Sequence, residues 1–297
     1  MLLVNSNAVT KIMGGFGNQL FCYACGYAVA KENGRALIID TSQQDNDPYR
    51  NVDILRLNIQ YSRRITFRKR KNLLSRAIGN RIKLMKEMGF FPTRIKEKQP
   101  YVYQDSVFTN NSQNIYLDGY WQSEKYFKKY RTDLLEMFTP QVPFIKDKCS
   151  IENNPCVAIH IRHGDYLAIG CAIDECYYEK AITYIKKMIG ENLEFLIFSD
   201  DIEYAKRFAQ SRHNLKMTVV NSEGDNQTLR DFYRMTSCTH FIIANSSYSW
   251  WAAWLGKAPE KIVICPESNM WTGDFYPEEW IKIKAGISNN ESGNEKE

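Results

Sequence analysis

The carboxyl-terminal half of the chain alternates short apolar runs with amphipathic stretches, and this alternation constrains the fold more than any other feature. The apolar runs predict strands at 156–161, 194–199, 216–220, 239–244 and 261–264. Between them, the apolar spacing predicts helices near 175–189, 201–210, 226–236 and 247–256. Repeated strand–helix units of this kind imply a parallel sheet. The second half therefore reads as an α/β domain.

A similar unit opens the chain. Residues 9–13 predict a strand, Gly14, Gly15 and Gly17 follow as a glycine-rich loop, and an apolar helical face runs from 18 to about 34. A second strand at 36–39 ends at Asp40. This is the phosphate-binding half of a Rossmann-like domain. Residues 15–20 read G-x-G-x-x-L, with Leu20 where a third small residue should stand. An NAD-type oxidoreductase is therefore an alternative, and general anion binding is the stronger expectation.

Prolines divide the chain into two domains. The polar segment TPQVPFIKDKCSIENNP at 139–155 contains three of them and marks the boundary. We predict an N-terminal Rossmann-like domain at 1–145, a C-terminal one at 155–284, and a disordered tail at 285–297. Within the first domain we also expect strands at 101–107 and 114–117. A helix is expected at 123–138, with Ser123 as its cap.

Positive charge is concentrated in one segment of the first domain. Residues 63–98 contain thirteen Lys or Arg and two Glu, a net charge of +11 in a chain whose net charge is +5. A solvated helical insertion is the commoner meaning of such a block. The alternatives are peripheral contact with an anionic membrane, or a non-enzymatic binder of anionic lipid or RNA.

Neither cysteine spacing nor hydropathy indicates a secreted or membrane-spanning protein. The eight cysteines form no small-domain disulfide framework, and Cys22 and Cys25 are expected to be buried thiols in an apolar helix. No apolar run approaches the ~18 residues of a membrane span, and the first ten residues lack the features of a signal peptide. We therefore expect a cytoplasmic protein. Asp45 and Asp47 form a D-x-D before Pro48, which favours a turn over a metal site.

Polar side chains gather where predicted strands end. The strand at 156–161 runs into HIRHGDY at 160–166, the next strand ends in FSDD at 198–201, and NSSYS at 245–249 opens a helix. Open α/β sheets bind ligands at the carboxyl ends of their strands. Arg162 offers a planar fork of donors suited to phosphate or carboxylate. The structural alternatives are an ion pair between Arg162 and Asp165 and simple helix caps at the other two positions.

Taken together, these stretches resemble glycosyltransferase family 11, the bacterial-type α-1,2-fucosyltransferases. The matching segments are GGFGNQLFCYACG at 14–26, HIRHGDY at 160–166, FSDD at 198–201, NSSYSWWAAWLG at 245–256 and GYWQSEKYF at 119–127. The resemblance implies a GT-B fold, with two Rossmann-like domains facing across a cleft. It implies transfer of fucose from GDP-β-L-fucose, with inversion and without metal or other cofactor. The acceptor would be the 2-hydroxyl of a terminal galactose in a glycan. Only the charge of the basic block, and not the resemblance, suggests that this glycan is lipid-linked.

The resemblance also assigns roles to residues. Arg162 would stabilise the leaving GDP. Transfer also requires a general base within hydrogen-bond reach of the acceptor hydroxyl, and the residue types, not the resemblance, make Asp165 and His163 the candidates. His163 stands where the family has a second arginine. The expected donor-binding residues are Gly15, Gly17, Asn18, Gln19, His160, Arg162, Asp200, Asp201, Asn245, Ser246, Ser247 and Tyr248. Independently of the resemblance, Tyr120 and Trp121 are candidates for stacking on the acceptor sugar, and Trp250 and Trp254 are expected in the core.

Overall fold

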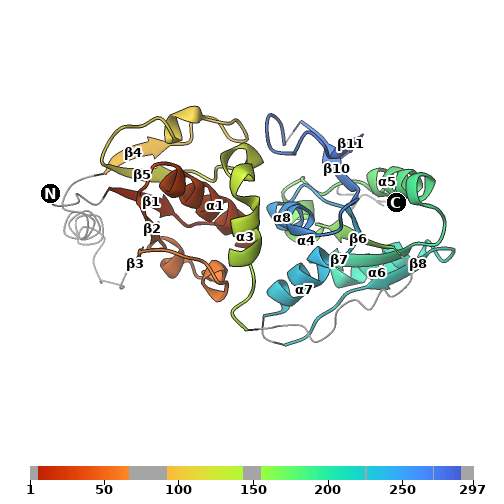
Figure 1. Ribbon diagram of the computed structural model, residues 1–297. Coiled ribbons are helices and arrows are strands. Elements are labelled where there is room, and N and C mark those ends of the chain that lie inside the picture. The colour runs from red at the N-terminus through yellow and green to blue at the C-terminus, as the bar shows by residue number, and fades with distance from the viewer. Residues whose placement is uncertain (1–5, 67–91, 143–154, 225, 270, 289–297) are drawn as a thin grey trace, which may run out of the picture. The chain divides into compact units, whose positions relative to one another are not determined.

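The chain forms two compact α/β units. The computed structural model (Figure 1) describes residues 6–66, 92–142, 155–224, 226–269 and 271–288. The first unit comprises Met1–Val142 with Gly273–Pro277, and the second comprises Pro143–Thr272 with Glu278–Glu297. Each unit is built on its own parallel sheet. The fold class expected from the sequence, a GT-B-like pair of Rossmann-like units, is confirmed.

The first unit has a five-stranded parallel sheet in the order β3-β2-β1-β5-β4. Its strands are β1 (Asn7–Lys11), β2 (Ala36–Asp40), β3 (Arg63–Ile65), β4 (Thr93–Lys96) and β5 (Asn114–Asp118). Its helices are α1 (Phe16–Glu32) and α3 (Arg131–Met137), with 3-10 turns η1 (Gln44–Asn46), η2 (Asp53–Arg56), η3 (Asp105–Val107), η4 (Glu124–Tyr126) and η5 (Lys128–Tyr130). The central part of the basic block, 67–91, lies outside the described residues.

Two predicted elements of the first unit are wrong. The strand expected at 101–107 is absent from this described segment, because Tyr101 has a φ of 63°, a left-handed conformation that interrupts an extended chain. The helix expected at 123–138 is broken at Phe127, whose φ of −139° is not helical. Phe127 is fully buried, and its ring packs 5.9 Å from that of Phe21. Ser123 does cap the first turn, because its Oγ accepts a hydrogen bond from the Lys125 N–H.

Helix α1 packs closely against β1. It buries most of its residues, among them Cys22 and Cys25, as expected for structural thiols, and burial raises the pKa of Cys22 to about 12. The Thr10 hydroxyl on β1 donates a 2.7 Å hydrogen bond to the Cys22 carbonyl. Gly26 makes this approach possible, since a Cβ there would lie 2.5 Å from the Thr10 Cβ.

Replacing Gly26 with alanine is expected to lower the free energy of unfolding by about 1–3 kcal/mol or more, the usual cost of overpacking a core. Urea unfolding followed by circular dichroism measures the change. Gly15→Ala is the matched control, because its added Cβ meets no atom within 4 Å and its φ is −69°. Equal unfolding midpoints for the two variants would show that α1 can move away from β1 without cost.

The second unit has a six-stranded parallel sheet in the order β11-β10-β9-β6-β7-β8. Its strands are β6 (Cys156–Ile161), β7 (Glu194–Ser199), β8 (Lys216–Val219), β9 (His240–Ile242), β10 (Val263–Glu267) and β11 (Ile281–Lys284). Its helices are α4 (Gly164–Ala168), α5 (Glu175–Ile189), α6 (Ile202–Gln210), α7 (Gln227–Thr236) and α8 (Ser247–Leu255). When β6 is numbered 1 and the sheet is read from the β8 edge, the strand order is 3-2-1-4-5-6. This is the order of dinucleotide-binding Rossmann folds. The strand order reverses between β6 and β9, where such sheets bind ligands.

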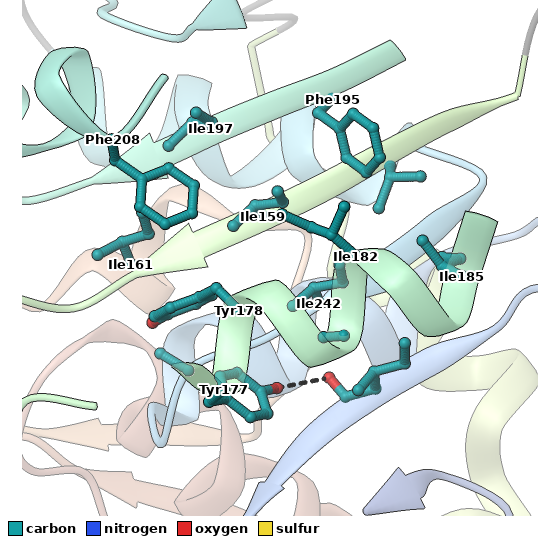
Figure 2. Packing of buried hydrophobic residues seen from close by; sticks show 14 of the residues in the cluster. Ile159, Ile161, Tyr177, Tyr178, Ile182, Ile185, Phe195, Ile197, Phe208 and Ile242 are labelled. Carbon is teal, nitrogen blue, oxygen red and sulfur yellow. Dashed lines mark hydrogen bonds between the residues drawn. The ribbon is translucent and has the colours of Figure 1, made fainter. Parts of the chain in front are cut away.

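The core of the second unit fixes α5 on the sheet. Tyr177, Tyr178 and Ile182 of α5 pack against isoleucines and Phe195 of β6 and β7 (Figure 2). The Tyr177 hydroxyl donates 2.7 Å and 3.2 Å hydrogen bonds to the carbonyls of Ile243 and Ile264, just after β9 and within β10. The core positions of Trp250 and Trp254 are confirmed, since both are buried and their rings stack at 6.1 Å. This packing holds the carboxyl ends of β6 and β9 in place.

Two features near the carboxyl terminus differ from the predicted domain limits. The segment Gly273–Pro277 belongs to the first unit, where the Asp274 carboxylate accepts hydrogen bonds from the Tyr103 N–H and from Lys125. Residues 285–288 are held by main-chain bonds, including one from the Ser288 N–H to the Ala172 carbonyl at 2.8 Å. The expected tail therefore starts no earlier than 289, and 289–297 lie outside the described residues. No helix in the described ranges is long and apolar enough to cross a membrane.

Candidate active site

Arg162 follows β6 directly and is oriented by two carboxylates. Its Nη2 lies 2.7 Å from Asp165 Oδ2, and its Nε lies 3.3 Å from Asp200 Oδ2. The guanidinium carbon also lies 5.3 Å from the centre of the Tyr166 ring. The side chain nevertheless remains 32% exposed. The ion pair that we considered as an alternative to ligand binding thus exists, and it holds a guanidinium that a ligand can still reach.

Asp200 and Asp201 organise the loop after β6. Asp200 Oδ1 accepts hydrogen bonds from the backbone N–H groups of His163 (2.9 Å) and Gly164 (3.3 Å). Asp201 caps α6 by accepting the Tyr204 N–H at 2.9 Å, and its other oxygen lies 2.9 Å from His163 Nδ1. The Tyr204 N–H is the main cause of the lowered pKa of Asp201, and His163 adds to it. All four carboxylate oxygens have partners within the fold, so the structure gives these two expected donor-binding residues a structural role.

His163 is held rigidly. Its ring stacks on that of Tyr204 with centroids 3.9 Å apart and an 11° angle between the planes. Together with the contact from Nδ1 to Asp201, this stacking fixes the orientation of the imidazole. The sequence signalled His163 as a departure from the family pattern but gave no indication of Tyr204.

Helix α8 begins at the carboxyl end of β9, the strand beside β6. Ser246 is its N-cap, with Oγ accepting the Tyr248 N–H at 3.3 Å. The cap expected from the sequence is therefore present, and it leaves the amino-terminal end of a helix at the point where the strand order reverses. Ser247 lies in the first turn, and the Tyr248 hydroxyl donates to the Thr228 carbonyl at 2.7 Å.

Some buried polar atoms of the second unit near the ends of β6 and β9 and on α7 have no hydrogen-bond partner among the described residues. They include His160 Nδ1, Asn245 Oδ1 and Asp231 Oδ1. Burial, together with the charge of Arg162, lowers the pKa of His160 to about 3, so this imidazole is neutral. Unpaired buried polar atoms are costly in a folded protein, and a bound ligand is one way to satisfy them.

Asp231, on α7, is a residue that the sequence analysis missed. Burial raises its pKa, although Ser222 donates hydrogen bonds to the carboxylate. Its charge contributes to the raised pKa of Tyr248, after burial of that phenol, and Arg162 acts on the same phenol in the opposite direction. Asp231 and Arg162 are therefore both within electrostatic reach of Tyr248. The available signal was an acid between the apolar positions Leu229 and Phe232 of an amphipathic helix.

The predicted residues of the first unit gather around the start of α1. Gly14 has a φ of 81°, and a Cβ there would lie 2.9 Å from Asn18 Nδ2. Gly15 is the N-cap of α1, and Gly17 is buried in its first turn. Asn18 Oδ1 accepts a 3.0 Å hydrogen bond from Gln122 Nε2. This unit thus supplies a glycine-rich helix start with one oriented amide.

Two predicted roles in this unit require correction. Gln19 is buried and fully used by the fold, because its amide donates to the Gly14 and Asn51 carbonyls and accepts the Ile54 N–H. It therefore shapes the loop and has no group left for the donor. Trp121 is fully buried with its ring edge-on to that of Tyr126, so it cannot stack on a sugar. Tyr120 is half-buried and remains a candidate.

The two acidic features that suggested other chemistry are structural. Asp45 pairs with Arg64 at 2.6 Å, and Asp47 accepts the Tyr49 N–H at 2.9 Å, as expected for a turn. Asp40 stands at the strand end where a dinucleotide-binding fold has its ribose-binding acid. It accepts the Tyr116 hydroxyl at 2.8 Å and is 5% exposed, which argues against the NAD alternative. The described part of the chain contains no group of three or more His, Cys, Asp or Glu that could hold a metal ion.

The model of glycosyl transferase family 11 matches residues 5–284. The chain belongs to this family. An α-1,2-colitosyltransferase from Escherichia coli is 30% identical over 296 residues, covering 94% of this chain and 99% of the relative. The galactoside 2-α-L-fucosyltransferase SEC1 from Bos taurus is 24% identical, covering 82% and 62%. Among solved structures, NodZ α-1,6-fucosyltransferase soaked with GDP-fucose has a TM-score of 0.50 at 14% identity, covering 88% of this chain and 95% of that one.

The family assignment and the fold agree. At 14% identity, the likeness to NodZ supports a shared fold. The match to the family model covers both units, including the glycine-rich loop before α1 and the loop after β6. This family 11 chain is therefore a glycosyltransferase, and its polar clusters at the strand ends are the candidate active site.

Proposed function

We propose that this family 11 enzyme transfers L-fucose from GDP-β-L-fucose to the 2-hydroxyl of a terminal galactose, with inversion and without a metal ion. The observation that carries the proposal is Arg162, oriented by Asp165 and Asp200 at the reversal point of the second sheet. The names of the relatives support a deoxysugar donor and an α-1,2 linkage. They also support a galactose-ended acceptor.

Arg162 and α8 provide positive charge for the leaving group. When the bond between sugar and phosphate breaks, negative charge accumulates on the β-phosphate of GDP. A guanidinium forms paired hydrogen bonds with phosphate oxygens, and the free N–H groups at a helix start add favourable dipoles. Both lie in fixed positions before the reaction, which is the condition for stabilising charge in a transition state.

Asp231 and His160 are the proposed contacts for the guanine base. Guanine presents two adjacent donors, N1–H and the exocyclic amino group, whereas adenine has no donor at its N1. The unpaired oxygen of Asp231 is an acceptor in need of such donors. The neutral His160 ring lies 5.5 Å from that of Tyr248, the phenol within electrostatic reach of both Asp231 and Arg162. This chemistry favours GDP over ADP.

His163 is the better of the two candidates for the general base. Its Nδ1 is held by Asp201, which leaves Nε2 as the nitrogen available to take a proton from the acceptor hydroxyl. Asp165 has one oxygen engaged by Arg162, and together with Asp200 it orients the guanidinium. We therefore propose that Asp165 positions Arg162 while His163 serves as the base.

We expect EDTA at about 5–10 mM, on the order used to strip divalent cations, to leave the rate of transfer unchanged, because the positive charge for the leaving group comes from Arg162 and α8. The assay follows radiolabelled fucose from GDP-fucose to galactose-ended oligosaccharides. The matched reaction contains excess Mg²⁺. A strict requirement for Mg²⁺ or Mn²⁺ would contradict the metal-free mechanism.

The transfer assay also separates the competing donors, and a binding assay separates the competing functions. GDP-colitose is the second candidate donor, because one relative is named a colitosyltransferase. Thermal shift with GDP, NAD and a short RNA distinguishes the enzyme from the two alternatives raised by the sequence. Stabilisation by NAD or RNA without stabilisation by GDP would overturn the proposal.

A further inference from the structure

Glu97 is a partly buried carboxylate at the carboxyl end of the first sheet, and the proposed mechanism does not use it. It follows β4 directly, and its Oε2 and Oε1 accept the N–H groups of Tyr120 (2.9 Å) and Trp121 (3.0 Å). The Gln122 N–H also bonds to it. The structure gives no ion-pair partner for Glu97 among the described residues. Burial raises its pKa and the three N–H groups oppose this effect, so backbone donors compensate the charge.

The turn that Glu97 holds is strained and closely packed. Trp121 has a φ of 58°, which is unfavourable for a residue with a side chain. A Cβ on Gly119 would lie 2.5 Å from the Glu97 Cβ, so the turn can approach the carboxylate only with glycine there. The contacts with Glu97 compensate for the backbone strain and fix the direction in which the chain leaves the turn.

The turn delivers Gln122 to Asn18. Gln122 is buried, and its Nε2 donates a 3.0 Å hydrogen bond to Asn18 Oδ1 in the first turn of α1. Because the oxygen of Asn18 is occupied, its Nδ2 remains as a donor beside the glycine-rich loop. A donor held at the start of a helix is suited to an oxygen of a phosphate or of a sugar hydroxyl.

We propose that Glu97 is a positioning residue, which holds the turn at 119–122 so that Gln122 fixes the Asn18 amide as an N–H donor for a substrate oxygen at the glycine-rich loop. This inference rests on the proposed function for the identity of that substrate. It adds three residues, Glu97, Gln122 and Asn18, which are connected by hydrogen bonds through the turn.

The test is a double-mutant cycle. Glu97→Gln replaces one acceptor with a donor that faces a backbone N–H, and Gln122→Met removes the contact to Asn18 without changing Glu97. Each is expected to lower kcat for fucosyl transfer at least tenfold. The kcat of the double variant should be no lower than that of the more impaired single variant, because the effects of residues that act through one another are not additive. Arg94→Gln is the matched control on β4, where it removes an exposed ion pair with Asp118. It should keep at least half of the kcat while its Tm falls.

A second readout does not depend on the donor. The ¹⁵N NMR signals of the Asn18 side-chain amide should move to the same new position in Glu97→Gln and Gln122→Met, and stay in place in Arg94→Gln. Unchanged Asn18 signals in Glu97→Gln, or kcat losses that multiply in the double variant, would overturn the inference. If the unmodified enzyme transfers no fucose, the proposed donor is wrong, and the NMR comparison alone decides whether Glu97 positions Asn18.

Discussion

Replacing Arg162 with alanine should lower kcat for fucosyl transfer by about 10³-fold or more, while the protein remains folded. Loss of a single pre-oriented donor to a developing anion costs about 10²–10³ in rate, and Arg162 supplies a charged pair of donors. Stability should change by about 1 kcal/mol or less, because the side chain is 32% exposed and pairs with carboxylates in contact with solvent. Initial rates at saturating donor and a thermal melt measure the two effects.

Arg162→Lys is the informative companion variant. It keeps the charge but not the planar fork, so a point charge alone would restore most of the rate, whereas paired hydrogen bonding would leave it at least tenfold below that of the unmodified enzyme. Asp165→Asn weakens the ion pair and should produce a smaller loss of kcat than Arg162→Ala. Near-normal turnover of Arg162→Ala would remove Arg162 from the mechanism and leave α8 as the remaining source of positive charge.

The fold of the second unit could be predicted from the sequence because its elements are independent and strongly patterned. β6, β7 and α5 have the predicted limits, and the remaining predicted strands and helices lie within a few residues of them. β11 was missed because its alternation of exposed and half-buried residues at 281–284 contains two lysines and no continuous apolar run. In the first unit, burial of the Phe127 ring overrides the local helical pattern. This burial depends on tertiary contacts, which a sequence pattern does not contain.

Candidate residues that are adjacent in sequence could be named from the sequence, whereas those that meet only through the fold could not. Arg162, His163 and Asp165 share one segment, so their proximity is local. Gln19 and Trp121 also lie beside predicted site residues, yet the fold uses them for packing and hydrogen bonds. Asp231 and Glu97 stand in unremarkable segments, and their roles depend on which donors the backbone places around each carboxylate.

Replacing Asp231 with asparagine is expected to weaken GDP binding about 100-fold and to stabilise the protein without ligand. Hydrogen bonds to a charged group contribute about 1.5–3 kcal/mol each, and the asparagine amide would place N–H donors against those of guanine. Burial raises the pKa of Asp231 in the folded protein, so the charged carboxylate costs stability above this pKa, and the fold regains that stability as pH falls through it. A neutral amide of the same shape removes that penalty, which predicts a higher Tm for the variant.

The two effects separate a base-recognition role from a structural one. Calorimetry should show that Asp231→Asn raises the Kd for GDP while leaving weak ADP binding unchanged, so the preference for guanine disappears. Affinity of the unmodified enzyme for GDP should fall as pH drops, because guanine donors require the carboxylate form. Glu203→Gln is the matched control, since it removes a carboxylate that is 73% exposed on α6. A Kd for GDP that does not change, or a Tm that falls, would show that Asp231 holds the fold and that another group selects the base.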